Sequence, residues 1–291
     1  MTVMVTGAEG MLGLCVLELL SKKRINAIPI DFKSQHGAIN ADICNAEQMF
    51  STIEKTKPDF IIHTAAQTNV DLISRDKSRG YKVNSWGTNV LAAAAANFDI
   101  PIIYISTDYV FDGTRTEPYN EFNTPRPINE YGRSKLEGEK VIRDLCKKFF
   151  IVRTSGLFAP HGKNFPLTIM ENARKLKELK VVSDQVFSPT YAYDLAEYLI
   201  SLLDSKIYGV YHFCNSGQCS WYEFAKYILE TAGIKDCKLH PITSREYPTP
   251  TSRPAFSVLR RYKLELQGKD NVRSWQEAVN EFIDKTGVKN L

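Results

Sequence analysis

Short apolar runs alternate with longer amphipathic stretches throughout the first half of the chain. The apolar runs span residues 3–6, 25–30, 60–63, 102–105 and 150–153, and their length predicts strands. Residues 11–22, 84–97 and 131–145 follow a helical pattern. Strands that alternate with helices are typical of βαβ units. The pattern therefore predicts an α/β fold of the Rossmann type, a doubly wound parallel sheet with helices on both faces.

The pattern is less regular after residue 155. Helices are predicted at 165–180, 192–203 and 220–233, a strand and turn at 181–188, and a strand at 209–213. Ser220 and Glu223 have the spacing of a capping box at the start of the third of these helices. The tail beyond residue 240 is mixed and interrupted by prolines. We expect these segments to form a smaller, discontinuous α/β lobe.

A glycine-rich turn follows the first predicted strand. Gly7, Gly10 and Gly13 are spaced Gly-x-x-Gly-x-x-Gly and enclose Met11 and Leu12. Glycine lets the backbone turn sharply and lets a diphosphate approach the N-terminus of the next helix, where free N–H groups and the helix dipole favour anions. These five residues are therefore predicted to bind a dinucleotide.

The second predicted strand ends at a residue that bears on which dinucleotide binds. Asp31 lies 18 residues beyond Gly13, where a carboxylate can accept hydrogen bonds from an adenosine ribose and favour NADH. Lys33 can instead pair with a 2′-phosphate and favour NADPH. The sequence leaves both cofactors open.

Two further segments extend the predicted cofactor site. Asp42 and Ile43 lie on a predicted loop after the second strand, where they can cover the adenine. Ala65 and Ala66 follow the third strand, and their small side chains let the cofactor lie close to the backbone. We interpret His63, just before them, as a hydrogen-bonded core histidine rather than a catalytic one.

The strongest set of candidate catalytic residues is Thr107, Tyr131 and Lys135. Thr107 ends a predicted strand, and Tyr131 and Lys135 are four residues apart, on one face of a helix. A lysine ammonium near a phenol lowers the phenol pKa. Such a tyrosine can exchange a proton with a substrate oxygen, which the threonine hydroxyl can bind. Tyr131 and Lys135 are also expected to contact the cofactor, the lysine through a ribose hydroxyl.

Composition and charge exclude several other classes of protein. The 291 residues contain 37 Lys and Arg against 33 Asp and Glu, a formal net charge of +4 with no long run of like charge, so we expect no nucleic-acid partner. No apolar stretch is long enough to span a membrane, and the N-terminus lacks a signal-peptide pattern, so we expect a cytoplasmic location. The six scattered cysteines include no Cys-x-x-Cys pair, which favours free thiols and no metal site.

Taken together, the motifs resemble the dTDP-4-dehydrorhamnose reductase family of the extended short-chain dehydrogenase/reductases. The similarity runs almost from end to end of the chain. The matching segments are 6–13, 63–71, 82–84 with 87–88, 106–113, 131–135, 153–155, 162–165, 184–185 with 188–190, 194–196 and 253–255.

The resemblance implies a reaction and a role for each catalytic residue. In that family NADPH or NADH reduces the C4 keto group of a dTDP-linked deoxysugar, which yields dTDP-L-rhamnose or a related sugar for polysaccharides. Tyr131 would protonate the oxygen, Lys135 would bind the nicotinamide ribose and Thr107 would bind the sugar. Asn84 matches a position near the cofactor.

The resemblance also implies substrate contacts and an oligomeric state. Asp108 is expected beside Thr107 in the substrate site. Arg253 would bind the diphosphate of the nucleotide sugar in a bidentate geometry, with help from Asn164. A homodimer is expected from the family alone.

Two segments depart from the family pattern. The family usually has an aromatic residue after the Arg-Thr-Ser segment, and it lines the sugar pocket, whereas this chain has Gly156. Residues 71–74 replace a more acidic stretch. The sugar is therefore expected to lose a stacking surface, which leaves the exact sugar and nucleotide open.

Alternatives differ in how well the residues fit them. A dehydratase of this superfamily typically has Asp-Glu after the threonine, whereas this chain has Asp108-Tyr109, which favours hydride transfer without elimination. An epimerase uses the same Tyr and Lys. That alternative, another nucleotide-sugar ketoreductase and a non-catalytic dinucleotide-binding regulatory subunit all stay open.

The expected organisation places the site between two lobes. We predict a dinucleotide-binding domain over residues 1–155 and 179–216 and a substrate-binding lobe over residues 156–178 and 217–291. The active site is expected in the cleft between them, at the carboxyl ends of the strands.

Overall fold

Seven strands form one parallel sheet in the computed structural model, which describes residues 1–34 and 37–287. The strands are β1 (Thr2–Thr6), β2 (Asn26–Asp31), β3 (Ile39–Asn40), β4 (Phe60–His63), β5 (Ile102–Thr107), β6 (Phe149–Thr154) and β11 (Gly209–His212). Their order across the sheet is β11-β6-β5-β4-β1-β2-β3, with every neighbouring pair parallel. The predicted Rossmann-type α/β fold is confirmed.

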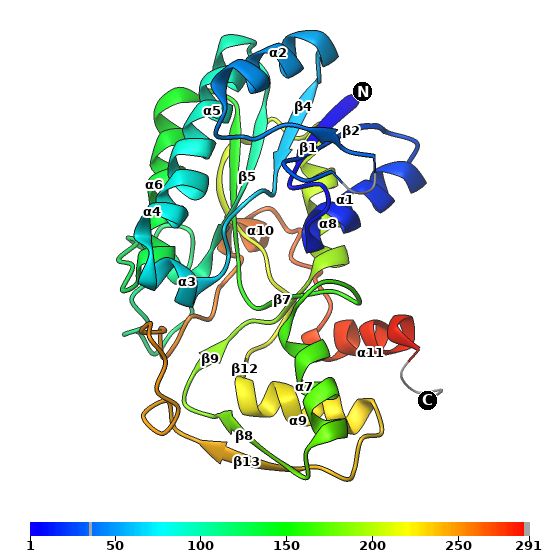
Figure 1. The fold of residues 1–291 in the computed structure, drawn as a ribbon, viewed down its shortest axis with the longest axis vertical. Coiled ribbons are helices and arrows are strands. Elements are labelled where there is room, and N and C mark those ends of the chain that lie inside the picture. The colour runs from blue at the N-terminus through cyan, green and yellow to red at the C-terminus, as the bar shows by residue number, and fades with distance from the viewer. Residues whose placement is uncertain (35–36, 288–291) are drawn as a thin grey trace.

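Helices cover both faces of the sheet (Figure 1). On one face α1 (Met11–Lys22) and α8 (Ala192–Ser201) pack against the sheet in one apolar cluster. On the other face α2 (Ala46–Thr56), α5 (Thr88–Asn97) and α6 (Glu130–Leu145) form a second cluster. Because β1 and β4 are neighbours whose chains leave in opposite directions across the sheet, a crevice opens at their carboxyl ends.

A second lobe lies beyond the carboxyl ends of the strands (Figure 1). Its elements are β7 (Leu157–Phe158), α7 (Phe165–Lys175), β8 (Glu178–Val182), β9 (Val186–Phe187), β10 (Thr190–Tyr191), β12 (Cys219–Ser220), α9 (Trp221–Thr231), β13 (Lys238–Ile242) and α11 (Trp275–Thr286). The helices α7, α9 and α11 share an apolar core of their own. The predicted capping box is present, since Ser220 and the Glu223 side chain each bond the other's backbone N–H.

Some element boundaries differ from the sequence prediction. The helix predicted at 165–180 ends at Lys175, and the chain then enters β8. This strand pairs with β13, which overlaps the tail segment for which the sequence predicted no regular element. The helix predicted at 84–97 begins as a π-helix, Tyr81–Gly87, preceded by α3 (Val70–Arg75) and α4 (Lys77–Gly80). The remaining short elements are α10 (Tyr262–Leu266) and the 3₁₀ turns η2 (Asp108–Val110) and η3 (Leu202–Asp204). Pairing of distant segments, which local patterns do not report, accounts for the first difference.

These pairings bear on the boundary between the lobes. β8 and β9 pair with strands of the second lobe, and Val181 and Phe187 lie in its apolar core. We therefore propose that the chain returns to the sheet domain after Tyr191, at the start of α8, rather than at residue 179. None of the helices in the described part of the chain is both long and apolar enough to cross a membrane.

His63, at the end of β4, is held as a neutral core residue. Its side chain is 1% exposed, and Thr6 Oγ1 lies 2.8 Å from Nδ1 while Thr88 Oγ1 lies 3.1 Å from Nε2. Since the Thr88 hydroxyl donates to the Asn84 carbonyl, it accepts from Nε2–H, and the Thr6 hydroxyl donates to Nδ1. Burial lowers the pKa of His63 to about 3, and the Lys135 ammonium acts in the same direction.

This lowered pKa predicts a stability that falls in mild acid. Between about pH 6.5 and about pH 3 the unfolded chain binds a proton on His63 that the folded chain does not, so stability decreases as the pH falls, by up to about 1.4 kcal/mol per pH unit. Urea unfolding of the wild type and His63→Gln at about pH 7 and about pH 5 measures this. The variant should lose less stability between the two conditions, with the remainder due to groups such as the buried His212. Equal losses in the two proteins would contradict the assignment.

Candidate active site

The glycine turn after β1 brings three backbone segments close together. Gly7 has φ +69°, and a Cβ there would lie 2.6 Å from the Ala65 backbone nitrogen. A Cβ on Gly13 would lie 2.1 Å from the Gly7 carbonyl oxygen. Only glycine fits at these two positions, and the turn leaves the N-terminus of α1, capped by Gly10 without a side-chain hydrogen bond, open to the crevice.

A cavity of about 980 Å³ occupies this crevice. Most of the predicted cofactor residues line it: Gly7, Gly10, Met11, Leu12, Asp31, Lys33, Asp42, Ile43, Ala65, Ala66, Tyr131 and Lys135. The close approach of backbone at Gly7 and the open helix N-terminus fit the diphosphate of a dinucleotide.

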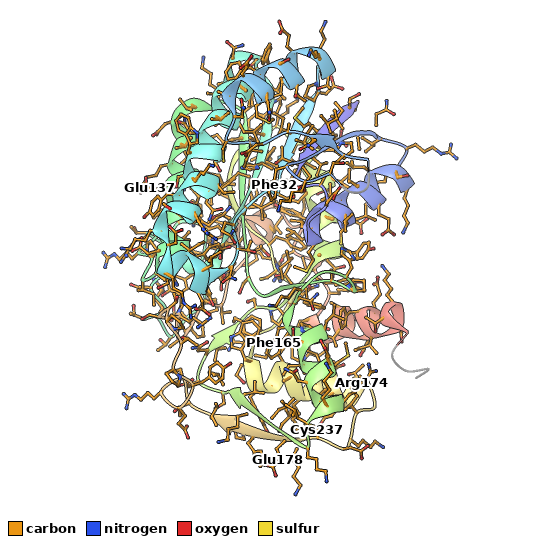
Figure 2. The ribbon with its side chains drawn as sticks, in the orientation of Figure 1. Phe32, Glu137, Phe165, Arg174, Glu178 and Cys237 are labelled. Atoms are coloured by element: carbon orange, nitrogen blue, oxygen red, sulfur yellow. The ribbon has the colours of Figure 1, made fainter. Side chains whose placement is uncertain are left out.

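Asp31 and Lys33 lie together at one end of this cavity. The Asp31 carboxylate accepts a hydrogen bond from the Glu9 N–H at 3.1 Å, so it also holds the glycine turn against β2. The Lys33 ammonium lies 5.4 Å from the centre of the Phe32 ring, which is 63% exposed beside the cavity (Figure 2). Both of the residues that the sequence offered for cofactor preference therefore line the site.

Thr107, Asp108 and Tyr131 form a hydrogen-bonded chain at the inner end of the cavity. The Thr107 hydroxyl donates to Asp108 Oδ1 at 3.0 Å and hydrogen-bonds Tyr131. Ser155 donates to Asp108 Oδ2 at 2.8 Å. Burial raises the pKa of Asp108 to about 6, against the hydrogen bonds from Ser257, Ser155 and Thr107, so the carboxylate is mostly ionised at neutral pH and orients the Thr107 hydroxyl.

The electrostatics of Tyr131 differ from the sequence prediction. Burial raises the pKa of Tyr131 to about 12, the Thr107 hydrogen bond lowers it, and Asp108 raises it further. The predicted lowering of this pKa by Lys135 is wrong, because the 3% exposed Lys135 directs its ammonium at the ring of Tyr104, 4.1 Å away. Burial also lowers the pKa of Lys135 to about 7, opposed by Glu139. At neutral pH Tyr131 therefore holds its proton and can donate it.

A smaller cavity of about 160 Å³ adjoins the same residues. It shares Thr107, Asp108, Tyr131, Ser155 and Gly156 with the larger cavity. Its other lining residues come from α3, the turn η2 and the second lobe: Val70, Tyr109, Gln185, Val186, Phe187, Trp221, Pro254 and Ser257. The two cavities thus meet at Tyr131, with one side formed by the sheet domain and the other by the second lobe.

Four of the predicted site residues lie outside the linings of these two cavities. Gly13 lies beneath the turn, and the fully buried Asn84 amide bonds Gln67 and Ser134. Asn164 caps α7, and its amide bonds the Ala159 carbonyl. Arg253 forms an ion pair with Asp71 at 3.2 Å. These contacts show how each residue holds neighbouring segments in place.

The structure also brings in residues that the sequence analysis did not select. Phe187 on β9 and Trp221 on α9 stack with ring centres 3.9 Å apart. Gly156 has φ +54°, and a Cβ there would lie 2.2 Å from Phe187 Cε2. The space expected to lack an aromatic surface is therefore occupied by Phe187. The Trp221 position follows the capping box, but no local pattern links either ring to Tyr131.

The described residues offer no cluster of three or more His, Cys, Asp or Glu side chains suited to a metal ion. The six cysteines are all free thiols.

Comparison with known proteins gives similarity over nearly the whole chain. The family model described as the RmlD substrate binding domain matches residues 1–288. The spore coat polysaccharide biosynthesis protein SpsK of Bacillus subtilis is 38% identical over 97% of each chain.

Two solved structures are similar in fold as well as in sequence. A dTDP-4-dehydrorhamnose reductase from Clostridium acetobutylicum has a TM-score of 0.93 and 41% identity, over 98% of this chain and 99% of that one. A dTDP-4-dehydrorhamnose reductase from Bacillus anthracis, in complex with NADP, has a TM-score of 0.93 and 38% identity over the same shares.

Proposed function

Because the chain belongs to the RmlD substrate binding domain family, we propose that it is an NADPH- or NADH-dependent dTDP-4-dehydrorhamnose reductase. It reduces the C4 keto group of a dTDP-linked 6-deoxysugar to a hydroxyl group. The observation that carries the proposal is the meeting of a dinucleotide-sized cavity and a smaller cavity at Tyr131, whose raised pKa keeps its proton available.

The larger cavity is proposed to hold the dinucleotide. Gly7, Gly10 and the N-terminus of α1 bind its diphosphate, and Lys135 binds the nicotinamide ribose. When bound, the reduced nicotinamide supplies a hydride to the keto carbon. Asp31 is proposed to bind the adenosine ribose of NADH, or Lys33 the 2′-phosphate of NADPH, and Asp42 and Ile43 to cover the adenine; all four residues line the cavity.

The protein's own side chains handle the substrate oxygen and its proton. The Thr107 hydroxyl, which donates its hydrogen to Asp108 before the sugar binds, turns that hydrogen to the keto oxygen when the sugar is in place. Tyr131 donates its phenolic proton to that oxygen as negative charge develops on it. Reduction therefore consumes one hydride and one proton and leaves an alcohol.

We propose that three of the predicted site residues hold segments of the site in place: Asn84, Asn164 and Arg253. Asn84 fixes the Gln67 backbone at the cavity wall, and Asn164 bonds the loop before α7. Arg253 holds α3, which carries Val70 at the smaller cavity. The cytoplasmic location and the homodimer stay predictions from the sequence and the family.

A direct assay tests the proposed function. Purified protein is mixed with NADPH or NADH and enzymatically prepared dTDP-4-dehydrorhamnose, and dinucleotide oxidation is followed by the loss of its near-ultraviolet absorbance. We expect oxidation that requires the sugar and yields one dTDP-L-rhamnose per dinucleotide. If the protein bound a dinucleotide tightly but oxidised neither NADPH nor NADH, the proposal would be contradicted and a binding subunit favoured.

A further inference from the structure

The smaller cavity has an aromatic wall supplied by the second lobe. Phe187 and Trp221 stack at an interplanar angle of 23°, and both line the cavity together with the sheet domain's Thr107 and Tyr131. Phe187 is 3% exposed, whereas Trp221 is only partly buried. The indole therefore has the more accessible surface of the two stacked rings.

The position of this wall is fixed by backbone pairing. β9 and β12 pair antiparallel with Phe187 opposite Cys219, which places Trp221 beside Phe187 at the first turn of α9. The Val186 N–H donates to the Ala255 carbonyl at 2.8 Å, so β9 is also held from the tail. Phe165 packs on Trp221 with ring centres 4.7 Å apart, and Figure 2 shows it at the start of α7.

Gly156 lets the wall approach the catalytic residues. A Cβ at this position would lie 2.2 Å and 2.5 Å from two atoms of the Phe187 ring, and the backbone has a positive φ. A side chain at position 156 and the observed Phe187 position therefore exclude each other. The glycine allows the ring to reach the part of the cavity that Thr107 and Tyr131 also line.

We propose that the Phe187–Trp221 pair is the surface on which the sugar ring of a nucleotide sugar packs, with Tyr131 on the opposite side. A 6-deoxyhexose presents C–H bonds and a methyl group that pack favourably on an aromatic face, and its oxygens then point towards Thr107 and Tyr131. The pair would select the sugar and leave the nucleotide to other contacts. This inference deepens the proposed function and rests on it for the identity of the sugar.

Binding measurements with two ligands separate the sugar from the nucleotide. Isothermal titration calorimetry measures the affinities of dTDP-L-rhamnose and of dTDP in the presence of saturating dinucleotide. The ratio of the two affinities gives the contribution of the sugar. In Trp221→Ala we expect dTDP-L-rhamnose to bind about tenfold more weakly while dTDP binding is unchanged. Trp221→Phe, which keeps an aromatic face, should recover part of the loss.

Phe165, a neighbour of Trp221 that lines neither cavity, provides a matched control. Phe165→Ala removes a ring that packs on Trp221 but lies outside the linings of both cavities, so it should leave the ratio of the two affinities unchanged. The proposal is overturned if Trp221→Ala weakens both ligands equally or neither, or if the wild type binds dTDP-L-rhamnose no more tightly than dTDP. If the wild type binds dTDP-L-rhamnose more tightly than dTDP but oxidises no dinucleotide, the Phe187–Trp221 pair is supported as a sugar-binding surface and the reductase function is contradicted.

Discussion

Tyr131→Phe is expected to lower kcat by about 10³-fold, because it removes the only proton that the proposed mechanism delivers from the protein to the keto oxygen. The phenol is in its donating form at neutral pH, since burial raises its pKa to about 12. Phenylalanine keeps the ring and its edge-on contact with Tyr109, whose ring centre lies 5.9 Å away. Dinucleotide binding should therefore change little while turnover falls.

The measurement compares steady-state kcat with dinucleotide affinity in the same preparations. Tyr81→Phe is a suitable control, since Tyr81 donates its hydroxyl hydrogen to Glu130 near the start of α6 and lies outside both cavity linings. It should retain kcat close to that of the wild type. If Tyr131→Phe kept most of its turnover, another group would have to supply the proton and the assigned mechanism would be wrong.

Glu139→Leu is expected to destabilise the fold by about 3–5 kcal/mol, because it leaves the Arg153 guanidinium buried without its carboxylate. The two side chains are at most 1% exposed, and Arg153 donates to both Glu139 oxygens, at 2.8 Å and 2.7 Å. Ser106 donates to the same carboxylate at 2.6 Å. A loss of this size is a large share of the roughly 5–15 kcal/mol that stabilises a typical domain.

Denaturant unfolding of three variants tests the role of this pair. Glu137→Leu, two residues earlier on α6, removes an exposed pair with Lys140 and should cost no more than about 0.5 kcal/mol; Figure 2 shows Glu137 on the outer side of the helix. Glu139→Leu combined with Arg153→Met removes both charges and should be more stable than Glu139→Leu alone. A single variant as stable as the wild type would show that Arg153 finds other partners.

The catalytic pair and the buried pair lie on the same helix, yet they differ in how far the sequence reveals them. Tyr131 and Lys135 are recognisable because four-residue spacing places them on one face, and their motif follows a strand that ends in Thr107. Glu139 is one more turn along that face, but its partner Arg153 lies on β6, and the ion pair exists only because α6 packs across the sheet. The helical spacing gives no information about a partner on another element.

The sequence alone determined the features that depend on neighbouring residues. The alternation of apolar runs and amphipathic stretches specified the parallel sheet, because buried parallel strands are continuously apolar. The spacing of Gly7, Gly10 and Gly13 specified the turn, because only glycine allows that close approach of backbone. The cofactor residues that follow the first three predicted strands could be predicted because the carboxyl ends of parallel strands meet at one edge of the sheet.

The tertiary structure alone decided which distant segments meet at that edge. Phe187 reaches Trp221 through the pairing of β9 with β12, and Gly156 serves to admit the Phe187 ring, although its sequence context suggested only the loss of an aromatic surface. Arg253 pairs with Asp71 instead of lining a cavity. The direction of the Tyr131 pKa was likewise set by burial, which a sequence does not display. Each of these outcomes depends on packing between elements far apart in the chain, and the spacing of residues along the sequence gives no information about such contacts.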